Sequence, residues 1–292
     1  MLSILIPTYN YDCYRLVCDL HAQAESCGCR FEIIVADDAS PASPGNLDRI
    51  GGMTDCRLIR AERNMGRSNI RNFLADNARY PYLLFIDADA EVCRCDYIAK
   101  YLDYCAPGCC VAGGIAYEDG QYRPEYSLRL KYGRMREANP DYPKQFTAFN
   151  LLIDRDLFMS VRFDGSLTAY GYEDFLFGAD SRISSRLTVI DNPLIHAGLD
   201  DNMQYIRKVE EACANMLRVY RANRQTDLYA SSKLMRCYRL MEKTRCRYPV
   251  AMMFPLLRGI LLRNLTSPDP SMSALDIYKL LYTCHISVRK LM

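Results

Sequence analysis

The sequence lacks the long apolar segments and the strong charge excess that mark several protein classes. No stretch reaches the ~18 to 20 apolar residues that a membrane-spanning helix needs. The first 30 residues contain only the short apolar run MLSILIP, without a basic flank before it, so no signal peptide is indicated. Half of the 292 residues are hydrophobic, a quarter are charged and the net charge is +2, which excludes disordered and collagen-like chains. We therefore expect a soluble, cytoplasmic protein.

Two common phosphate-binding motifs are also absent. No G-x-G-x-x-G follows the first predicted strand, which argues against a dinucleotide-binding dehydrogenase. No G-x-x-x-x-G-K-[ST] occurs anywhere, which argues against a P-loop ATPase. Any phosphates that the protein binds must be held in another way, and we expect a metal ion and arginine to hold them.

Cysteine is abundant, with 14 residues, but its pattern does not fit a disulfide scaffold, because such scaffolds are usually short and secreted. Cys27 and Cys29 form a C-x-C pair, as do Cys93 and Cys95, and no second pair with histidine lies at zinc spacing. We predict reduced, partly buried cysteines, with a metal or redox site as the alternative.

Charge divides the chain into two regions. Residues 1–199 hold 21 Lys and Arg against 27 Asp and Glu, a balance of −6, whereas residues 200–292 hold 16 against 8, a balance of +8. We therefore predict a first domain over residues 1–199, with halves at about 1–117 and 118–199, and a basic helical region over 200–292.

The first region alternates between short apolar segments and amphipathic ones, which is typical of an α/β fold with a doubly wound, mainly parallel sheet. The predicted strands are residues 3–7, 31–36, 57–60, 82–86, 111–116, 149–153 and 188–190. The predicted helices between them are residues 14–26, 44–53, 68–78 and 96–105. Ligands of such sheets bind outside the carboxyl ends of the strands, so the residues after each strand are the candidate site.

Acidic residues follow two of these strands. Asp37 and Asp38 come after the second strand, and Asp87 and Asp89 come after the strand over residues 82–86. Four carboxylates at neighbouring strand ends repel one another unless a cation lies between them, and carboxylate oxygens suit Mg²⁺ or Mn²⁺. The alternative is that each aspartate caps a helix or turn.

The segment Asn64-Met65-Gly66-Arg67-Ser68-Asn69-Ile70-Arg71-Asn72 offers a place for phosphate. Glycine allows the backbone to turn before a helix whose positive end is exposed. Arg67 and Arg71 are four residues apart, so they share one helix face. The alternative is a capped surface helix with solvated arginines.

These segments together resemble the family-2 glycosyltransferases of the GT-A fold, of bacterial type. The matching elements are Pro7-Thr8-Tyr9-Asn10, Asp37-Asp38-Ala39-Ser40, Asn64-x-Gly66 with Arg71-Asn72, and Asp87-Ala88-Asp89 after an apolar strand. Each of the first two elements alone is a weak indication of the family, but the series of four in this order is specific for it. The resemblance covers roughly residues 1–200. The resemblance implies a GT-A-type doubly wound mixed sheet with flanking helices, followed by a mostly helical region.

The resemblance also implies the residues that bind a nucleotide-sugar donor. One of Asp37 and Asp38 contacts the base, usually uracil, and the choice between them stays open. The D-x-D motif contacts ribose and the metal ion that bridges the diphosphate. The implied donor-binding residues are Pro7, Thr8, Tyr9, Asn10, Asp37, Asp38, Asn64, Gly66, Arg67, Arg71, Asp87 and Ala88.

A second motif, Tyr170-Gly171-Tyr172-Glu173-Asp174, resembles the acceptor side of the family, where the aspartate is the general base. In an inverting transfer the attacking hydroxyl must lose its proton as the new bond forms, and a carboxylate within hydrogen-bond reach can take it. We expect Asp174 to be this base, with Gly171, Tyr172 and Glu173 beside the acceptor. The alternative is a helix start stabilised by acids.

The metal site that the resemblance implies contains Asp87, Asp89 and His196, because many members place a histidine after the last strand of the sheet. Neutral imidazole is a suitable ligand of Mn²⁺. A lone histidine is otherwise more often a structural side chain. Residues 139–144, rich in polar and turn residues, are a candidate lid over the site.

The basic region reads as helices over residues 203–247, followed by the apolar run 250–262, which contains Pro255, Arg258 and Gly259. It either packs on the first domain or forms an amphipathic, membrane-surface element that contacts anionic lipid. In the second case the protein is peripheral at the inner face of the cell membrane. No nucleic-acid-binding motif is present, so we expect no nucleic-acid partner.

We therefore expect a metal-dependent inverting glycosyltransferase that uses Mn²⁺ or Mg²⁺. It would move a sugar from a nucleotide-sugar, in the family usually a UDP-sugar, to a hydroxyl of a glycan or lipid-linked glycan in polysaccharide biosynthesis at the cell envelope. The main alternative is a catalytically inactive family member that acts as a sugar-recognition or partner-binding module. A nucleotidyltransferase is a third possibility, but its glycine-rich phosphate loop is absent after the first strand.

Overall fold

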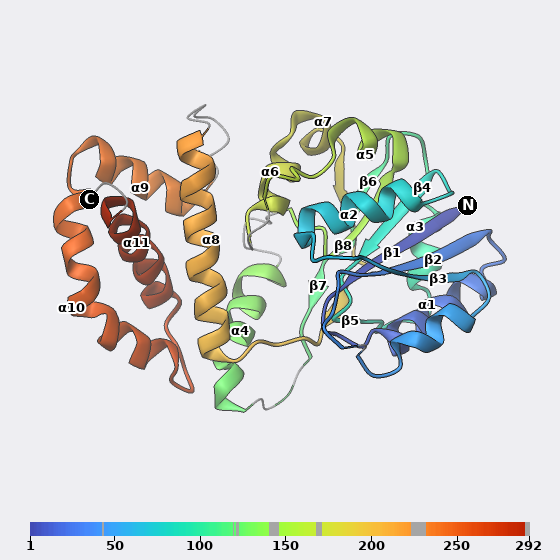
Figure 1. Ribbon diagram of the computed structural model, residues 1–292, viewed down its shortest axis with the longest axis horizontal. Helices are drawn as coiled ribbons and strands as arrows, with labels where there is room; N and C mark the ends of the chain where they lie inside the picture. Colours follow the sequence, from blue (N-terminus) through green and yellow to red (C-terminus); the bar gives the residue numbers. More distant parts are fainter. Residues whose placement is uncertain are drawn as a thin grey trace. The chain divides into compact units, whose positions relative to one another are not determined.

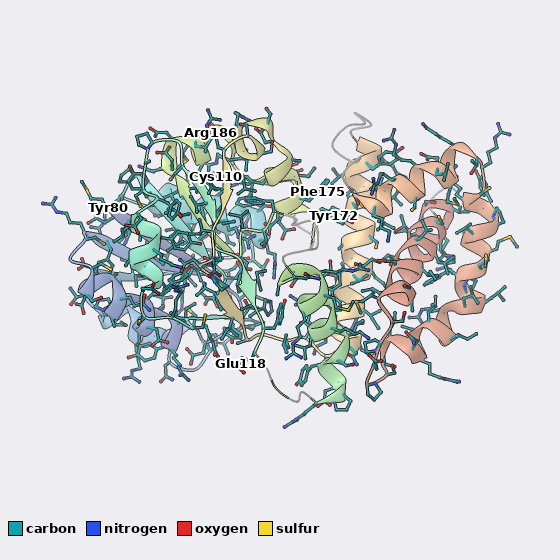
Figure 2. All side chains as sticks on the ribbon, turned by 180° about the vertical axis from the view of Figure 1, so that it is seen from behind. Tyr80, Cys110, Glu118, Tyr172, Phe175 and Arg186 are labelled. Carbon is teal, nitrogen blue, oxygen red and sulfur yellow. The ribbon has the colours of Figure 1, made fainter. Side chains whose placement is uncertain are left out.

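The computed structural model describes residues 1–42, 44–118, 120, 123–139, 146–167, 171–222 and 232–289. The chain divides into two compact units. The sheet unit consists of Met1–Glu118, Arg136–Thr168 and Glu173–Gly198, and the helical unit consists of Asp119–Met135, Ala169–Tyr172 and Leu199–Met292. Figure 2 labels Glu118, where the first segment of the sheet unit ends.

The sheet unit contains a seven-stranded mixed sheet with the strand order β3-β2-β1-β4-β8-β6-β9 (Figure 1). Its strand β8 is antiparallel to both of its neighbours, and the other pairings are parallel. The predicted α/β class with a mixed sheet is confirmed. The strands are β1 (Leu2–Thr8), β2 (Phe31–Asp37), β3 (Cys56–Arg60), β4 (Tyr82–Ile86), β6 (Cys110–Ala112), β8 (Asn150–Asp154) and β9 (Leu187–Val189).

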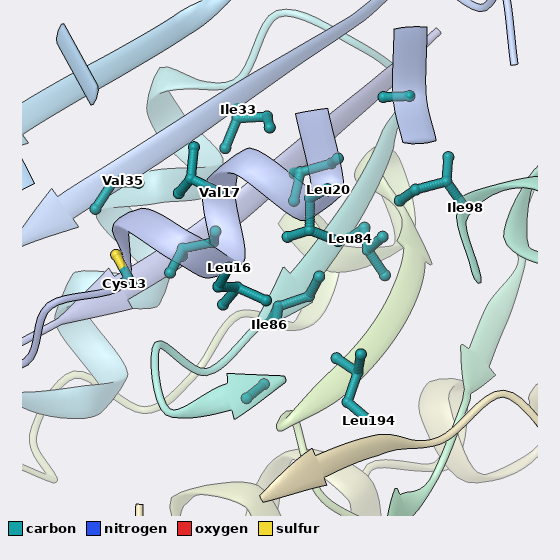
Figure 3. Packing of buried hydrophobic residues seen from close by; sticks show 14 of the residues in the cluster. Cys13, Leu16, Val17, Leu20, Ile33, Val35, Leu84, Ile86, Ile98 and Leu194 are labelled. Atoms are coloured by element: carbon teal, nitrogen blue, oxygen red, sulfur yellow. The ribbon is translucent and has the colours of Figure 1, made fainter. Parts of the chain in front are cut away.

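Helices cover both faces of this sheet because its central strands are apolar on both sides. In β1, Ile4 and Ile6 join one core cluster, whereas Leu5 joins the other. The first cluster includes residues of α1 and α3 (Figure 3), and the second includes residues of α2, α5 and α6. The helices are α1 (Tyr14–Ser26), α2 (Gly66–Asn77), α3 (Tyr97–Leu102), α5 (Arg155–Val161), α6 (Glu173–Ala179) and α7 (Ser181–Ser184).

A second, small sheet was not predicted. It has the order β5-β10-β7 and consists of β5 (Ala90–Glu91), β7 (Ile115–Ala116) and β10 (Leu194–His196). The expected strand over residues 111–116 is divided between β6 and β7, so its two ends belong to different sheets. The segment over 44–53, expected as an α-helix, is instead the shorter 3-10 helix η1 (Leu47–Gly52).

In its described residues, the helical unit contains four long helices and a shorter one, α4, around a core of its own. These helices are α4 (Ser127–Tyr132), α8 (Asn202–Ala222), α9 (Lys233–Lys243), α10 (Arg247–Leu265) and α11 (Met272–Arg289). The 3-10 helix η2 (Pro124–Tyr126) leads into α4, and the π-helical turn η3 (Gly133–Glu137) follows it. α10 covers the apolar run 250–262 and continues through Pro255 and Gly259. Within the described residues, none of the helices has the length and apolar character needed to cross a membrane.

Residues 119–135 differ from the predicted boundary, since they group with the C-terminal helices. Leu128 lies in the core cluster of the helical unit, and its backbone N–H donates to Asn202 Oδ1 on α8 at 2.8 Å. The fourteen cysteines are free thiols in the structure, and several of them are buried, as the sequence predicted.

Candidate active site

The turns after β1 and β2 lie against each other, as the parallel pairing of the two strands requires. Thr8 is the register partner of Asp37, and the Asp38 N–H donates to the Thr8 carbonyl at 2.9 Å. The Asn10 N–H donates to Ser40 Oγ at 2.8 Å. Pro7 is the partner of Ala36 inside the strand pair. Five predicted donor-binding positions are thus brought to one edge of the sheet.

Tyr9 is the exposed member of this group. Its side chain is 48% exposed, whereas Thr8 is buried and its hydroxyl donates to the Tyr11 carbonyl at 2.8 Å. Asn10 takes a left-handed conformation with φ 54°, which turns the chain at the strand end. An exposed aromatic ring on a fixed turn suits stacking against a planar base.

The two acids after β2 have different partners. Asp37 Oδ1 accepts from the Ser40 hydroxyl at 2.5 Å, and Oδ2 lies 3.8 Å from Arg60 Nε. Asp38 accepts through both oxygens from backbone N–H groups, from Met65 at 2.6 Å and from Gly66 at 3.0 Å. Asp38 therefore caps the start of α2, which is the alternative role considered for it above.

Burial raises the pKa of Asp38, and the hydrogen bonds from Met65 and Gly66 oppose that effect. Gly66 adopts φ 79°, a conformation that other residues rarely take, so glycine is needed at this turn. Asn64 adds a second acceptor for the Gly66 N–H at 3.2 Å. The segment that leads into α2 is thus held by side-chain acceptors and offers no open N–H at Gly66.

Arg71 on α2 lies at the centre of the site. Its side chain is only 2% exposed, and its Nη2 donates to Asp87 Oδ1 at 2.7 Å. Nη1 lies 3.5 Å from Asp174 Oδ1, and the guanidinium lies over the ring of Phe163. One buried cation therefore joins the first acid of the D-x-D motif to the expected general base.

The two arginines of α2 share one helix face, as their spacing predicted, and the structure shows that this face meets α6. Arg67 Nη1 lies 3.8 Å from Glu173 Oε1, one turn away from the Arg71–Asp174 pair. Burial raises the pKa of Glu173, and the neighbouring Asp174 raises it further. Asp174 is held in place by the Ala148 N–H, which donates to its Oδ2 at 3.0 Å. α6 begins at Glu173, so the helix start and the acidic pair coincide. Figure 2 labels Phe175, the next residue of α6.

The D-x-D motif occupies the turn between β4 and β5. Burial alone would raise the pKa of Asp87, but Arg71 and Arg67 outweigh it and hold the pKa below its ordinary value. Ala88 is buried, and the Asp87 N–H donates to the Phe149 carbonyl at 3.1 Å. Asp87 is thus charged and turned toward α2.

Asp89 faces His196 across the small sheet. Ala90 of β5 is the antiparallel partner of His196 of β10, and the Ala197 N–H donates to the Asp89 carbonyl at 2.9 Å. Asp89 Oδ2 and His196 Nε2 lie 3.6 Å apart. His196 lies within β10, rather than after the last strand, and this pairing brings it to the D-x-D motif.

The pair Asp89 and His196 fits a divalent metal that also binds a diphosphate. Carboxylate oxygen and imidazole nitrogen are both ligands of Mn²⁺, and such ions commonly take one or two carboxylates plus phosphate oxygens. Across the described residues, no group of three or more His, Cys, Asp or Glu side chains is arranged to hold a metal. The third predicted ligand, Asp87, is bonded to Arg71.

Several site residues were not predicted. The rings of Tyr117 and Phe149 stack on His196, with centroids 5.7 and 5.3 Å away, and fix the imidazole plane. Asn69 and Asn72 of α2 donate to the Gly165 and Phe163 carbonyls at 3.0 and 2.9 Å. The two asparagines lie in the segment Asn64–Asn72, and their side chains connect α2 to residues more than 90 positions later in the chain.

The remaining predicted residues belong elsewhere. Gly171 and Tyr172 lie in the helical unit, where Asn215 of α8 donates to the Gly171 carbonyl at 2.7 Å. A Cβ on Gly171 would come within 2.6 Å of Ala212 Cβ, so glycine is required there. Residues 140–145, most of the expected lid, and Tyr170 lie outside the described residues.

Solved structures similar to this chain are glycosyltransferases. A mannosyltransferase from Pyrobaculum calidifontis, solved in complex with GDP-Man and Mn²⁺, matches with a TM-score of 0.58 and 17% identity over 99% of this chain and 86% of its own. A mannosyl-3-phosphoglycerate synthase from Rubrobacter xylanophilus matches with a TM-score of 0.54 and 18% identity over 76% of this chain and 74% of its own. At these identities the likeness shows the fold. No curated protein matches the sequence.

The sequence also matches a protein-family model. The sequence profile described as "Glycosyl transferase family 2" matches residues 3–165, more than half of the chain. The matched range runs from β1 through β8 to Gly165 and includes the turns after β1, β2 and β4 described above. The chain therefore belongs to glycosyl transferase family 2 and is a glycosyltransferase of the GT-A fold.

Proposed function

We propose that this glycosyltransferase uses a divalent metal, Mn²⁺ or Mg²⁺, to transfer a sugar with inversion from a nucleotide-sugar to a hydroxyl group. The observation that carries the proposal is Arg71, which contacts both Asp87 and Asp174. The donor-side acid and the base are thus fixed relative to each other before substrates arrive. Such preorganisation lowers the barrier of a displacement in which two groups must be aligned.

Asp174 is the general base in this proposal. The Ala148 N–H fixes its Oδ2, while Oδ1 accepts no hydrogen bond from the described residues. Oδ1 is buried beside Arg71 Nη1, whereas the Asp174 side chain as a whole is 22% exposed. An acceptor hydroxyl that approaches the carboxylate from its exposed side would pass its proton to it as the hydroxyl oxygen bonds to the anomeric carbon. The sugar–phosphate bond breaks on the opposite side, and the bonding pair leaves with the nucleoside diphosphate.

Asp89 and His196 would hold the metal ion. When bound, the ion neutralises the charge that develops on the departing diphosphate. Tyr117 and Phe149 keep the imidazole plane fixed, and Asp87 keeps Arg71 in place. Arg71 is too deeply buried to reach solvent-side phosphates, so we assign it to positioning, and Arg67, which is half-exposed, to phosphate.

We propose a UDP-sugar as the donor, with Tyr9 stacked on the base and Asp37 in contact with its edge. Both oxygens of Asp38 accept hydrogen bonds at the start of α2, whereas in Asp37 one oxygen is bonded to Ser40 and the other only lies 3.8 Å from the charged Arg60 Nε. The acceptor is a glycan or lipid-linked glycan. A lipid-linked acceptor would place the enzyme at the inner face of the cell membrane, as a peripheral protein.

Thermal unfolding with UDP, GDP, CDP, ADP and dTDP, each with and without Mn²⁺, tests the donor assignment. A ligand at a hundred times its dissociation constant stabilises the fold by about 2.7 kcal/mol. We expect the UDP shift to be the largest and to need Mn²⁺. A larger increase in melting temperature with GDP would mean that the donor carries guanine instead of uracil. No increase with any nucleotide would favour the inactive binding module.

The substitution Asp174→Asn tests the base separately from the donor site. It keeps the hydrogen bond from Ala148 but removes the proton acceptor, so transfer should fall by about 10²- to 10⁴-fold while the nucleotide shift remains. Asp103→Asn, at an exposed aspartate after α3, is the matched control. Wild-type transfer by Asp174→Asn would remove Asp174 from the mechanism.

A further inference from the structure

The outward face of α10 is apolar. Its exposed large side chains include Met252 at 73%, Leu256 at 78% and Ile260 at 68%. They are spaced four residues apart, so they form one stripe along the helix, and Met253 lies beside it. An exposed stripe of this kind on a helix is unusual unless something covers it.

The opposite face of α10 is fully packed within the helical unit. Phe254 is buried, and its ring lies 5.5 Å from the rings of both Tyr278 and Tyr282 on α11. Ala251 and Leu265 are buried on the same side. α10 and α11 run side by side in Figure 1. The exposed stripe is therefore not required to hold the helix in its fold.

The charges around the stripe are of one sign. Between residues 243 and 268 the chain has five basic residues and no Asp or Glu. Arg247 is paired with Glu242 at 3.1 Å. Arg258 is four residues from buried Phe254 and interacts with Tyr278 of α11, so it lies toward the packed face of the helix. The exposed basic residues that remain near the stripe are Lys243, Arg245 and Arg263.

We infer that the outward face of α10 binds the surface of an anionic lipid bilayer. Met, Leu and Ile side chains would enter the boundary between headgroups and acyl chains, and the basic side chains would lie among the anionic headgroups. A second copy of the chain fits the face less well, because a two-fold contact would bring the same basic residues together. The inference deepens the proposed membrane location, but it depends on the helical unit and not on transfer.

Sedimentation of the full chain with vesicles tests the inference. We expect binding to phosphatidylcholine vesicles that contain phosphatidylglycerol, weaker binding to pure phosphatidylcholine, and loss of binding as salt rises from about 0.1 M to about 1 M. Leu256→Glu together with Ile260→Glu should lower partition at least about tenfold, because two apolar groups no longer enter the lipid. Lys243→Gln with Arg263→Gln should lower it about fivefold per charge.

Tyr104→Glu, at an exposed aromatic residue of the sheet unit, is the matched control and should bind lipid as the wild type does. The double variant Leu256→Glu and Ile260→Glu, called the α10 variant, should keep the wild-type melting temperature and the wild-type rate of sugar transfer to a soluble acceptor. A failure of lipid binding is therefore separable from a failure of the proposed function. Absence of binding to anionic vesicles, or equal binding by the α10 variant, overturns the inference. The inference is also overturned if sedimentation velocity shows that the wild type is a dimer and the α10 variant is a monomer.

Discussion

At the scale of single residues, Glu32 is a buried charge far from the chemistry. Its carboxylate accepts from Ser3 Oγ at 2.7 Å, from the Arg79 N–H at 2.6 Å and from Arg57 Nη2 at 3.0 Å. It lies at the first residues of β1 and β2, at the opposite end of these strands from the site. Burial raises the pKa of Glu32, but the hydrogen bonds from Arg79 and Ser3 outweigh burial and lower it.

We therefore predict that Glu32→Gln lowers the free energy of unfolding by about 1–3 kcal/mol at neutral pH, because a charged acceptor is lost. A carboxylate with a lowered pKa stabilises the fold above its unfolded-state pKa, and this contribution is lost as pH falls through the folded-state pKa. The difference in the free energy of unfolding between wild type and Glu32→Gln should thus become smaller below about pH 4.5. Urea unfolding at several pH values measures it, with exposed Glu62→Gln as the control. A constant difference at all pH values would contradict this assignment.

Arg71 contacts both Asp87 and Asp174, so its replacement should affect catalysis and stability. Lysine keeps the positive charge but is a single point donor, so it cannot hold Asp87 and Asp174 together as a planar guanidinium does. Arg71→Lys should lower kcat by about 10²-fold through misplaced groups, with a smaller change in KM for the donor. Arg71→Ala should also lower the free energy of unfolding, by about 1–3 kcal/mol, because the partly buried carboxylates of Asp87 and Asp174 lose a charged donor. Steady-state kinetics and melting, with exposed Arg63→Lys as control, separate the two effects. An unchanged kcat in folded Arg71→Lys would exclude the positioning role.

At the scale of elements, the short pairing of β5 with β10 decides where Asp89 lies. Gly198 follows β10, and a Cβ there would meet Asp89 Cβ and Oδ2 at 2.6 Å. We predict that Gly198→Ala displaces the Asp89 carboxylate and weakens the Mn²⁺-dependent part of the nucleotide shift by at least about tenfold in affinity. Gly52→Ala, where a Cβ meets nothing within 4 Å, is the matched control. Equal shifts for the two variants would mean that Asp89 does not bind the metal.

At the scale of the whole molecule, the units are built from interleaved segments of the chain. Residues 119–135 lie between strands of the sheet unit in sequence but belong to the helical unit. A chain ending at Gly198 would lose α8, the partner of α4, and would expose the buried Leu128.

We predict that a chain of residues 1–198 aggregates. The same chain with residues 119–135 replaced by a Gly/Ser linker of equal length should remain more soluble, because it lacks the uncovered apolar face of α4. Size-exclusion chromatography at equal concentration compares the two. Equal behaviour of both would mean that α4 does not depend on the C-terminal helices.

Much of the sheet unit could be predicted because its signals are local. The apolar segments 82–86 and 31–36 are bounded by polar residues, and the observed β4 and β2 match them to within a residue. The predicted helix 14–26 coincides with α1. β5 and β10 were missed because strands of two and three residues carry no periodicity and exist only through their pairing.

Local sequence patterns were enough to predict most strands of the large sheet, the acids that follow them, and the family to which this order belongs, since neighbouring residues produce these patterns. Three features became visible only in the folded chain: Arg71 is buried between Asp87 and Asp174, Asp38 rather than Asp37 caps α2, and residues 119–135 join the helical unit. Each of these depends on contacts between residues far apart in the chain. Such contacts are selected by packing and by the need of buried charges for partners, and no local pattern records them.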